Sequence, residues 1–141
     1  MFPSLDISTS ALVAHQVRMN VISQNLANVS TTRNETGELV PYQKRYVVLQ
    51  ADDGVGVGGQ GAAGVKVAEV QIDDSAPLYK WDPTNPDAVK QGPHQGYVAY
   101  PNVDMITEFT DALAVARAYE ANVGAIEIAK DLAQQTLRIL A

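Results

Sequence analysis

Apolar residues recur at alternating steps of four and three residues along the C-terminal part of the chain. Only one polar residue, Lys130, interrupts this stripe between about residue 102 and the end. Its members are Met105, Phe109, Ala112, Ala116, Tyr119, Val123, Ile126, Lys130, Ala133, Leu137 and Leu140. A repeat averaging 3.5 residues keeps a narrow apolar stripe facing a partner helix, as in a coiled coil. The pattern predicts a helix on the order of 58 Å long, at 1.5 Å per residue.

A second, less regular stripe predicts a helix over about residues 4–29. Its apolar members are Leu5, Leu12, Met19, Ile22, Leu26 and Val29, and its polar members are Ser8 and His15. A polar residue in such a stripe often sets the register of a helix pair, and this is our interpretation of His15. Lys130 either sets register or oligomeric state, or extends its charged end to water.

The middle of the chain, residues 33–99, is predicted to be rich in β-structure. Residues 42–51 and 64–72 contain many β-forming residues, and a glycine-rich stretch between them, residues 54–64, predicts a flexible hairpin tip. Several prolines between residues 77 and 93 exclude long regular elements there.

The last part begins near Pro101, which keeps the residue before it out of a helix, and we expect Asn102 to cap the long C-terminal helix. The predicted fold class is α+β, with long N- and C-terminal helices paired as an antiparallel coiled coil and a small β-rich region between them. This division gives three parts, residues 1–32, 33–99 and 100–141.

No pattern of residues predicts catalysis, a cofactor or a metal. The glycine-rich stretch matches the G-x-G-x-x-G fingerprint in three overlapping frames, but residues 65–67 then read as a strand, whereas a phosphate site needs a helix N-terminus there. The two histidines, His15 and His94, lie in different segments, and the chain has no Cys. We therefore expect a protein that is not an enzyme.

Composition excludes further classes of partner. The net charge is −6, and no basic cluster favours nucleic acid. No apolar run approaches the roughly 20 residues that cross a bilayer, and the first basic residue is Arg18, so we expect neither membrane insertion nor a cleavable signal peptide. The protein is expected to be soluble as made or to leave the cell by another route.

Residues 8–32 resemble the N-terminal motif of the bacterial flagellar axial proteins, the rod and hook subunits. The match centres on Ser10-Ala11-Leu12-Val13-Ala14 and Ile22-Ser23-Gln24-Asn25-Leu26-Ala27-Asn28-Val29-Ser30-Thr31. Residues 41–45, 64–67, 82–88, 96–103 and 117–123 are similar to segments of the proximal-rod members of that family. The chain departs from the family's usual residues at Thr84-Asn85 and at Asp104. The motif residues are Asn25, Ala27, Asn28, Thr31, Tyr100, Pro101, Asn102, Arg117, Tyr119, Glu120 and Asn122.

The resemblance implies a structural subunit of the proximal rod, the hollow drive shaft that crosses the periplasm. The two terminal helices would form the inner layer of the tube, with the apolar residues of both stripes as the assembly interface, and the middle region would lie outside. Implied partners are other copies of the chain, other rod subunits, inner-membrane ring and rod-adaptor proteins, and the flagellar type III export apparatus, which would export it without signal cleavage.

A second function class uses the same helices without a rod. A soluble coiled-coil adaptor or secreted interaction protein would form a small closed oligomer, whereas an axial subunit forms an open helical polymer through heterologous contacts.

Overall fold

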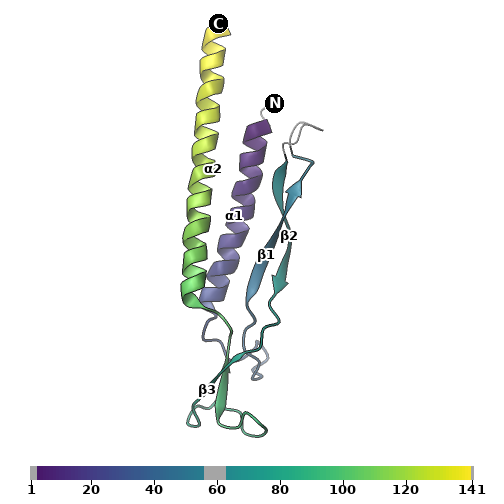
Figure 1. Ribbon diagram of the computed structural model, residues 1–141, viewed down its shortest axis with the longest axis vertical. Helices are drawn as coiled ribbons and strands as arrows, with labels where there is room; N and C mark the ends of the chain where they lie inside the picture. The colour runs from purple at the N-terminus through teal and green to yellow at the C-terminus, as the bar shows by residue number, and fades with distance from the viewer. Residues whose placement is uncertain (1–2, 56–62, 141) are drawn as a thin grey trace.

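The computed structural model describes residues 3–55 and 63–140 (Figure 1). Within these residues, one helix precedes four strands along the chain and a second helix follows them. In order they are α1 (Pro3–Ala27), β1 (Arg45–Asp52), β2 (Gly64–Ile72), β3 (Leu78–Trp81), β4 (Tyr97–Tyr100) and α2 (Met105–Leu140). The predicted α+β class is confirmed. Both long helices were predicted, and each ends or begins within about three residues of the expected position.

Helix α1 is the middle layer of the molecule. Helix α2 lies along one side of it with the opposite chain direction, and the β1–β2 hairpin lies along the other side (Figure 1). Because α1 is covered from two sides, it supplies much of the small apolar core, including Ala14, Val21 and Ile22. Helix α2 is covered on one side by α1 and extends past the start of α1 (Figure 1).

Asp104, rather than the predicted Asn102, caps helix α2. The Asp104 carboxylate accepts hydrogen bonds from the backbone N–H of Ile106, at 2.9 Å, and from the hydroxyl of Thr107, at 3.1 Å. The first of these bonds satisfies a backbone N–H group that the N-terminus of a helix otherwise leaves without a partner. The Asn102 side chain instead donates to the carbonyl of Ala76, at 3.2 Å, and so ties the loop before β3 to the start of α2.

The predicted hairpin is formed by β1 and β2, which pair antiparallel. The pairing runs from Arg45 opposite Ile72 to Asp52 opposite Gly64, with an irregularity between Val48 and Leu49. Strand β2 has the predicted bounds, whereas β1 begins three residues later than expected. The hydroxyl of Ser10 accepts a hydrogen bond from the Val65 backbone, which fastens the hairpin to α1. Residues 56–62 of the predicted glycine-rich tip lie outside the described residues.

A second small sheet, which was not predicted, lies beyond the lower end of the helix pair (Figure 1). Strands β3 and β4 pair antiparallel, from Leu78 opposite Tyr100 to Trp81 opposite Tyr97. Each strand has four residues, short enough to fit between the prolines that exclude longer elements. The fully buried Val98 in β4 and the nearby Ala88 form a local core.

The molecule is extended rather than compact. Its accessible surface is 9645 Å² for a mass of 15.1 kDa, whereas a compact monomer of that mass exposes roughly 7,000 Å². The excess leaves large apolar side chains in water along α2 and on both sheets. Such a chain has much apolar surface available for contact with other molecules.

A candidate assembly surface on the terminal helices

The face of α2 that contacts α1 is rotated by about one residue from the predicted stripe. Its two most buried residues within the helix are Glu108 and Val115, at 2% exposure each, and the predicted stripe had Phe109 and Ala116 instead. The two faces overlap, because Ala112, Ala116, Val123, Ile126 and Ala133 of the predicted stripe are half-buried, but they differ at Phe109 and Tyr119, which are exposed. Steps of four and three can alternate in either order. The sequence pattern favoured the order with the larger apolar residues, and the packing of Glu108 selects the other.

The predicted assembly residues consequently divide into two groups. Those that are buried or half-buried within the single chain are Leu5, Leu12, Met19, Ile22, Leu26, Val29, Ala112, Ala116, Val123, Ile126 and Ala133. Those that remain exposed are Met105, Phe109, Tyr119 and Leu137, at 42–67% exposure. The side chain of Leu140 lies outside the described residues. The exposed group is available for contact with a neighbouring molecule.

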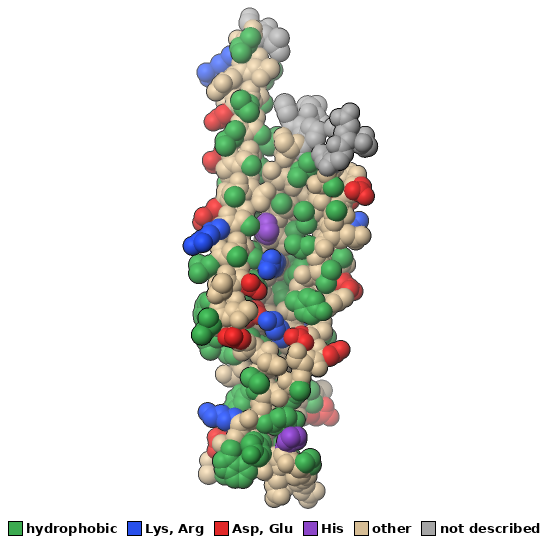
Figure 2. Space-filling view, in the orientation of Figure 1, with side chains coloured by type: hydrophobic (Ala, Val, Ile, Leu, Met, Phe, Trp, Pro, Cys, Tyr) green, Lys and Arg blue, Asp and Glu red, His purple; other side chains and the backbone are tan. Residues whose placement is uncertain are grey.

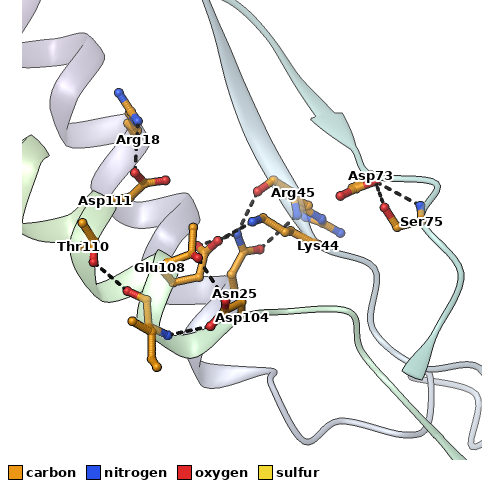
Figure 3. Close-up of polar contacts among 12 residues, drawn as sticks. Arg18, Asn25, Lys44, Arg45, Asp73, Ser75, Asp104, Glu108, Thr110 and Asp111 are labelled. Carbon is orange, nitrogen blue, oxygen red and sulfur yellow. Dashed lines mark hydrogen bonds and ion pairs between the residues drawn. The ribbon is translucent and has the colours of Figure 1, made fainter. Parts of the chain in front are cut away.

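A buried polar network joins the end of α1, the start of β1 and the start of α2 (Figure 3). At its centre is Asn25, which is 1% exposed. The Asn25 amide nitrogen donates to the carbonyl of Arg45, at 2.8 Å, and to the Glu108 carboxylate, at 3.1 Å. Its oxygen accepts from the Arg45 N–H and from the Tyr42 hydroxyl, both at 3.0 Å. All the hydrogen-bonding capacity of this side chain is therefore used within the chain.

Glu108 brings a negative charge into this network. Its carboxylate lies 2.7 Å from the ammonium nitrogen of Lys44, in an ion pair where the lysine side chain is 24% exposed and the glutamate 2%. Burial raises the pKa of the nearby Tyr42 hydroxyl. A buried carboxylate requires such partners, because an unpaired charge there is strongly destabilising. This role of Glu108 was not predicted from the sequence, since one acidic residue in the first turns of a helix is ordinary.

The other residues of the N-terminal motif shape the turn that ends α1. The Asn28 side chain donates to the carbonyl of Gln24, at 2.8 Å, and accepts from the hydroxyl of Thr31, at 3.1 Å. The Thr31 carbonyl then accepts from the Tyr42 backbone, which places the chain for β1. Ala27, at the last position of α1, is exposed.

An ion pair links the loop after α1 to the loop before β4. The Asp87 carboxylate accepts from the hydroxyl of Thr32 and from the guanidinium of Arg33, whose Nε lies 2.8 Å away. The Thr32 hydrogen bond, followed by Arg33, lowers the pKa of Asp87. These contacts connect the β3–β4 sheet to the helical part of the molecule.

The C-terminal motif divides between the interior and the surface. Tyr100 is half-buried in β4, and Pro101 is buried beside it. Asn122 donates to the carbonyl of Ala118 within α2, at 2.8 Å. Arg117, Tyr119 and Glu120, by contrast, are exposed on α2.

A groove of about 320 Å³ lies between the two helices near their middle. Helix α1 lines it with His15 and Met19 among others, and α2 lines it with Val115, Tyr119 and Glu120. The Nδ1 atom of His15 is buried and has no hydrogen-bond partner among the described residues. His15 therefore lies at the helix–helix boundary as predicted from its stripe, but it borders an open groove.

Exposed apolar side chains continue along the whole of α2, where Figure 2 shows hydrophobic groups from one end of the helix to the other. Near its start, Ile106 and Leu113 are 79% and 62% exposed. In its distal part the exposed apolar residues are Ile128, Leu132, Leu137 and Ile139, at 59–84%. No helix of the described residues is both long and apolar enough to cross a membrane. This surface is suited to contact with other helices.

Two family models match the two ends of this chain. Residues 5–33, which include most of α1, match the flagella basal body rod protein family, and residues 94–139, which include most of α2, match the C-terminal family of the flagellar basal body rod FlgEFG proteins. Both helices that form the candidate surface thus lie in segments characteristic of flagellar rod proteins.

Similar proteins extend the match to nearly the whole chain. The flagellar basal-body rod protein FlgC of Bacillus subtilis is 41% identical over 98% of this chain and 97% of its own length. FlgC of Borreliella burgdorferi is 33% identical over 99% and 97%, and FlgC of Salmonella typhimurium is 37% identical over 95% and 93%. The chain belongs to the FlgC family of flagellar basal-body rod proteins. It is a structural subunit of the rod, in a family of structural proteins rather than enzymes.

Proposed function

We propose that this subunit polymerises into the hollow proximal rod through its terminal helices. The observation that carries the proposal is the row of exposed apolar residues on α2, which among the described elements is covered by α1 alone and on one side. Exposure of these apolar side chains to water is unfavourable. Burying them against neighbouring helices stabilises the assembly by about 25 cal/mol per Å² of apolar surface removed from water.

The proposal assigns a role to each part of the chain. Residues 1–32 and 100–141 pair as an antiparallel coiled coil and form the inner layer of the tube, and residues 33–99 form the outer part. The opposed chain directions of α1 and α2 and the position of the hairpin on the far side of α1 support this division (Figure 1). The apolar residues of both stripes are then the assembly interface, some within a subunit and the exposed ones between subunits.

The resemblance to proximal-rod proteins supports the finer assignments. We extend the proposal to export through the flagellar type III apparatus, to a final position in the rod across the periplasm, and to contact with other rod subunits and with ring and adaptor proteins at the inner membrane. Cells that lack the export apparatus should retain this chain in the cytoplasm. Recovery of the chain from the periplasm of such cells would contradict this route.

The central test is Leu113→Asp in cells whose only copy of the gene carries the change. Leu113 is 62% exposed in the single chain, so the purified variant should unfold within about 0.5 kcal/mol of the parent. In a dry interface between subunits, however, an unpaired charge costs several kcal/mol. We expect unchanged protein levels, no rods and no swimming.

Leu113→Met is the matched control, because it keeps an apolar side chain of similar size at the same exposed position. Cells with this control should swim. Normal rods in the Leu113→Asp strain would show that this face of α2 is not part of the assembly interface.

A further inference from the structure

The part of the chain that carries β3 and β4, residues 78–100, is a self-contained unit, which we call the β3–β4 lobe. Of the described helices and strands, β3 and β4 pack only against each other, and they lie beyond the lower end of the helix pair (Figure 1). The loop between them is also bonded within the lobe. The backbone N–H of Val89 donates to the Tyr97 carbonyl, and that of Gly96 donates to the Val89 carbonyl, both at 2.9 Å. The lobe therefore has its own backbone framework.

One side chain, that of Asp87, makes every hydrogen bond and ion pair that joins this lobe to the rest of the described chain. One of its carboxylate oxygens accepts from the Thr32 hydroxyl. The other accepts from Nε of Arg33, at 2.8 Å, and from a second guanidinium nitrogen. The third guanidinium nitrogen of Arg33 donates to the Gly37 carbonyl, also at 2.8 Å, which fixes this side chain in the loop after α1. We call the contacts of Asp87 with Thr32 and Arg33 the Asp87 clasp.

Two short segments, residues 73–77 and 101–104, connect the lobe covalently to the hairpin and to α2. The Asn102 side chain donates to the Ala76 carbonyl, so the two segments are tied to each other. A cavity of about 210 Å³ lies beside them, lined by residues 40–44 of the helical part and by Ser75, Pro77 and Asn102 of the connections, among others. Open space at this junction leaves less packing to oppose a rotation of the lobe.

The lobe carries an exposed apolar face on β3. Leu78, Tyr79 and Trp81 are 42–60% exposed. The Tyr79 ring stacks on His94, with ring centroids 4.0 Å apart, and Trp81 makes an edge contact with Tyr97, at 5.0 Å. Both aromatic contacts lie within the lobe. The exposed face therefore keeps its shape whatever the orientation of the lobe.

We propose that the Asp87 clasp is a latch that fixes the orientation of the β3–β4 lobe, and that opening the latch lets the lobe turn as a unit about residues 73–77 and 101–104. The side chains of Arg33 and Asp87 are 45% and 19% exposed, and ion pairs that reach solvent break at modest cost. Unfolding the lobe would instead expose its core around the fully buried Val98. The clasp thus sets the direction in which β3 presents its exposed face, in the single chain and independently of polymerisation.

Spin labels on the purified full-length subunit test the latch. The chain has no Cys, so Ser23→Cys on α1 and Gln91→Cys in the lobe, both exposed, introduce the only two labelling sites. Pulsed electron paramagnetic resonance then measures the distribution of distances between the labels. We expect Asp87→Ala to broaden this distribution about twofold, because it removes the latch. A distribution as narrow as that of the parent would overturn the proposal.

Asp82→Ala is the matched control, because the Asp82 carboxylate accepts from the Thr84 hydroxyl within the lobe, at 2.8 Å. This control should leave the distribution unchanged. A second label pair, Ser23→Cys with the exposed Glu69→Cys on β2, should stay narrow in every variant, because the hairpin packs on α1. Equal broadening by Asp82→Ala and Asp87→Ala, or broadening of the second pair, would overturn the proposal, since the motion would not depend on the clasp or would not be confined to the lobe.

Near-ultraviolet circular dichroism separates turning of the lobe from its unfolding. The chain's one tryptophan, Trp81, lies in the lobe, and Asp87→Ala should keep its near-ultraviolet signal. Loss of that signal would overturn the proposal, because the lobe would then not be a self-contained unit.

Arg33→Ala tests the other side of the latch. It should also broaden the distances between the labels at positions 23 and 91. Arg33→Ala combined with Asp87→Ala should broaden them no more than Asp87→Ala alone, because both changes remove contacts of the same clasp. Further broadening in the double variant would show that the orientation of the lobe does not depend on this clasp alone, and would overturn the proposal.

Discussion

The indole ring of Trp81 lies directly over Gly96, so closely that a Cβ atom at position 96 would be 2.5 Å from the ring. Gly96 also has a φ of +83°, a conformation that residues with a side chain rarely adopt. Its backbone N–H donates to Val89, and its carbonyl accepts from Asp82. Gly96 therefore fixes both the loop before β4 and the position of the chain's one tryptophan.

Gly96→Ala should lower the free energy of unfolding by about 2–4 kcal/mol, from a left-handed backbone cost of roughly 1–2 kcal/mol and a steric clash. The control is Gly92→Ala, because Gly92 has a φ of +99° but a Cβ atom added there would meet nothing within 4 Å. Gly92→Ala should lower the free energy of unfolding only by the cost of the left-handed backbone conformation. Tryptophan fluorescence during denaturant unfolding measures both, and equal losses would show that the Trp81 contact costs nothing.

Gly124→Ala should stabilise the purified subunit by about 0.5–1 kcal/mol. Gly124 lies within α2, and an added Cβ would meet nothing within 4 Å. Thermal unfolding followed by circular dichroism measures the change. Ala125→Gly, at the next position, should destabilise by a similar amount. A destabilised Gly124→Ala would mean that this turn of α2 is not regular helix in solution.

Lys44→Met should destabilise the subunit by about 3 kcal/mol, because it leaves the Glu108 carboxylate buried without its cation. This value is at the low end for buried pairs, since Lys44 still reaches solvent. Adding Glu108→Leu should restore stability to within about 1 kcal/mol of the parent, as Asn25 keeps its bonds to Arg45. Chemical denaturation of the parent, the two single variants and the double variant measures the coupling between Lys44 and Glu108. Additive losses would refute this coupling.

The cap of α2 should make stability depend on pH in the acid range. The backbone N–H of Ile106, followed by the Thr107 hydroxyl, lowers the pKa of Asp104 below its usual value of 3.8. A carboxyl whose pKa is lower in the folded state contributes stability above the unfolded pKa, and loses it as pH falls through the folded pKa. The parent should therefore lose stability below about pH 4.

Asp104→Asn isolates this contribution, because Asn also caps helices but does not titrate. The difference in melting temperature between parent and variant should be greatest near neutral pH and should shrink as pH falls below about 4. A difference that is constant from neutral pH down to about pH 2 would show that Asp104 is not the titrating cap.

Local patterns in the chain were sufficient for much of the fold. Helix periodicity depends on neighbours three and four residues apart, and α1 and α2 were predicted nearly to their ends. The β-forming runs on either side of a glycine-rich stretch likewise predicted the β1–β2 hairpin. The short strands β3 and β4 were missed, because four residues carry little periodicity and because the close contact of Trp81 with Gly96 joins two separate segments of the chain.

The sequence by itself determined the two long helices and the β1–β2 hairpin, the absence of thiol chemistry and the family motifs, because each follows from residue types and their spacing along the chain. Only the tertiary structure decided which face of α2 meets α1. Two orders of the four–three repeat are equally regular in sequence, and the choice depends on Glu108 reaching Lys44 and Asn25, which are far away along the chain. The same packing leaves His15 at an open groove and the distal face of α2 uncovered, since what a side chain touches depends on the other elements around it.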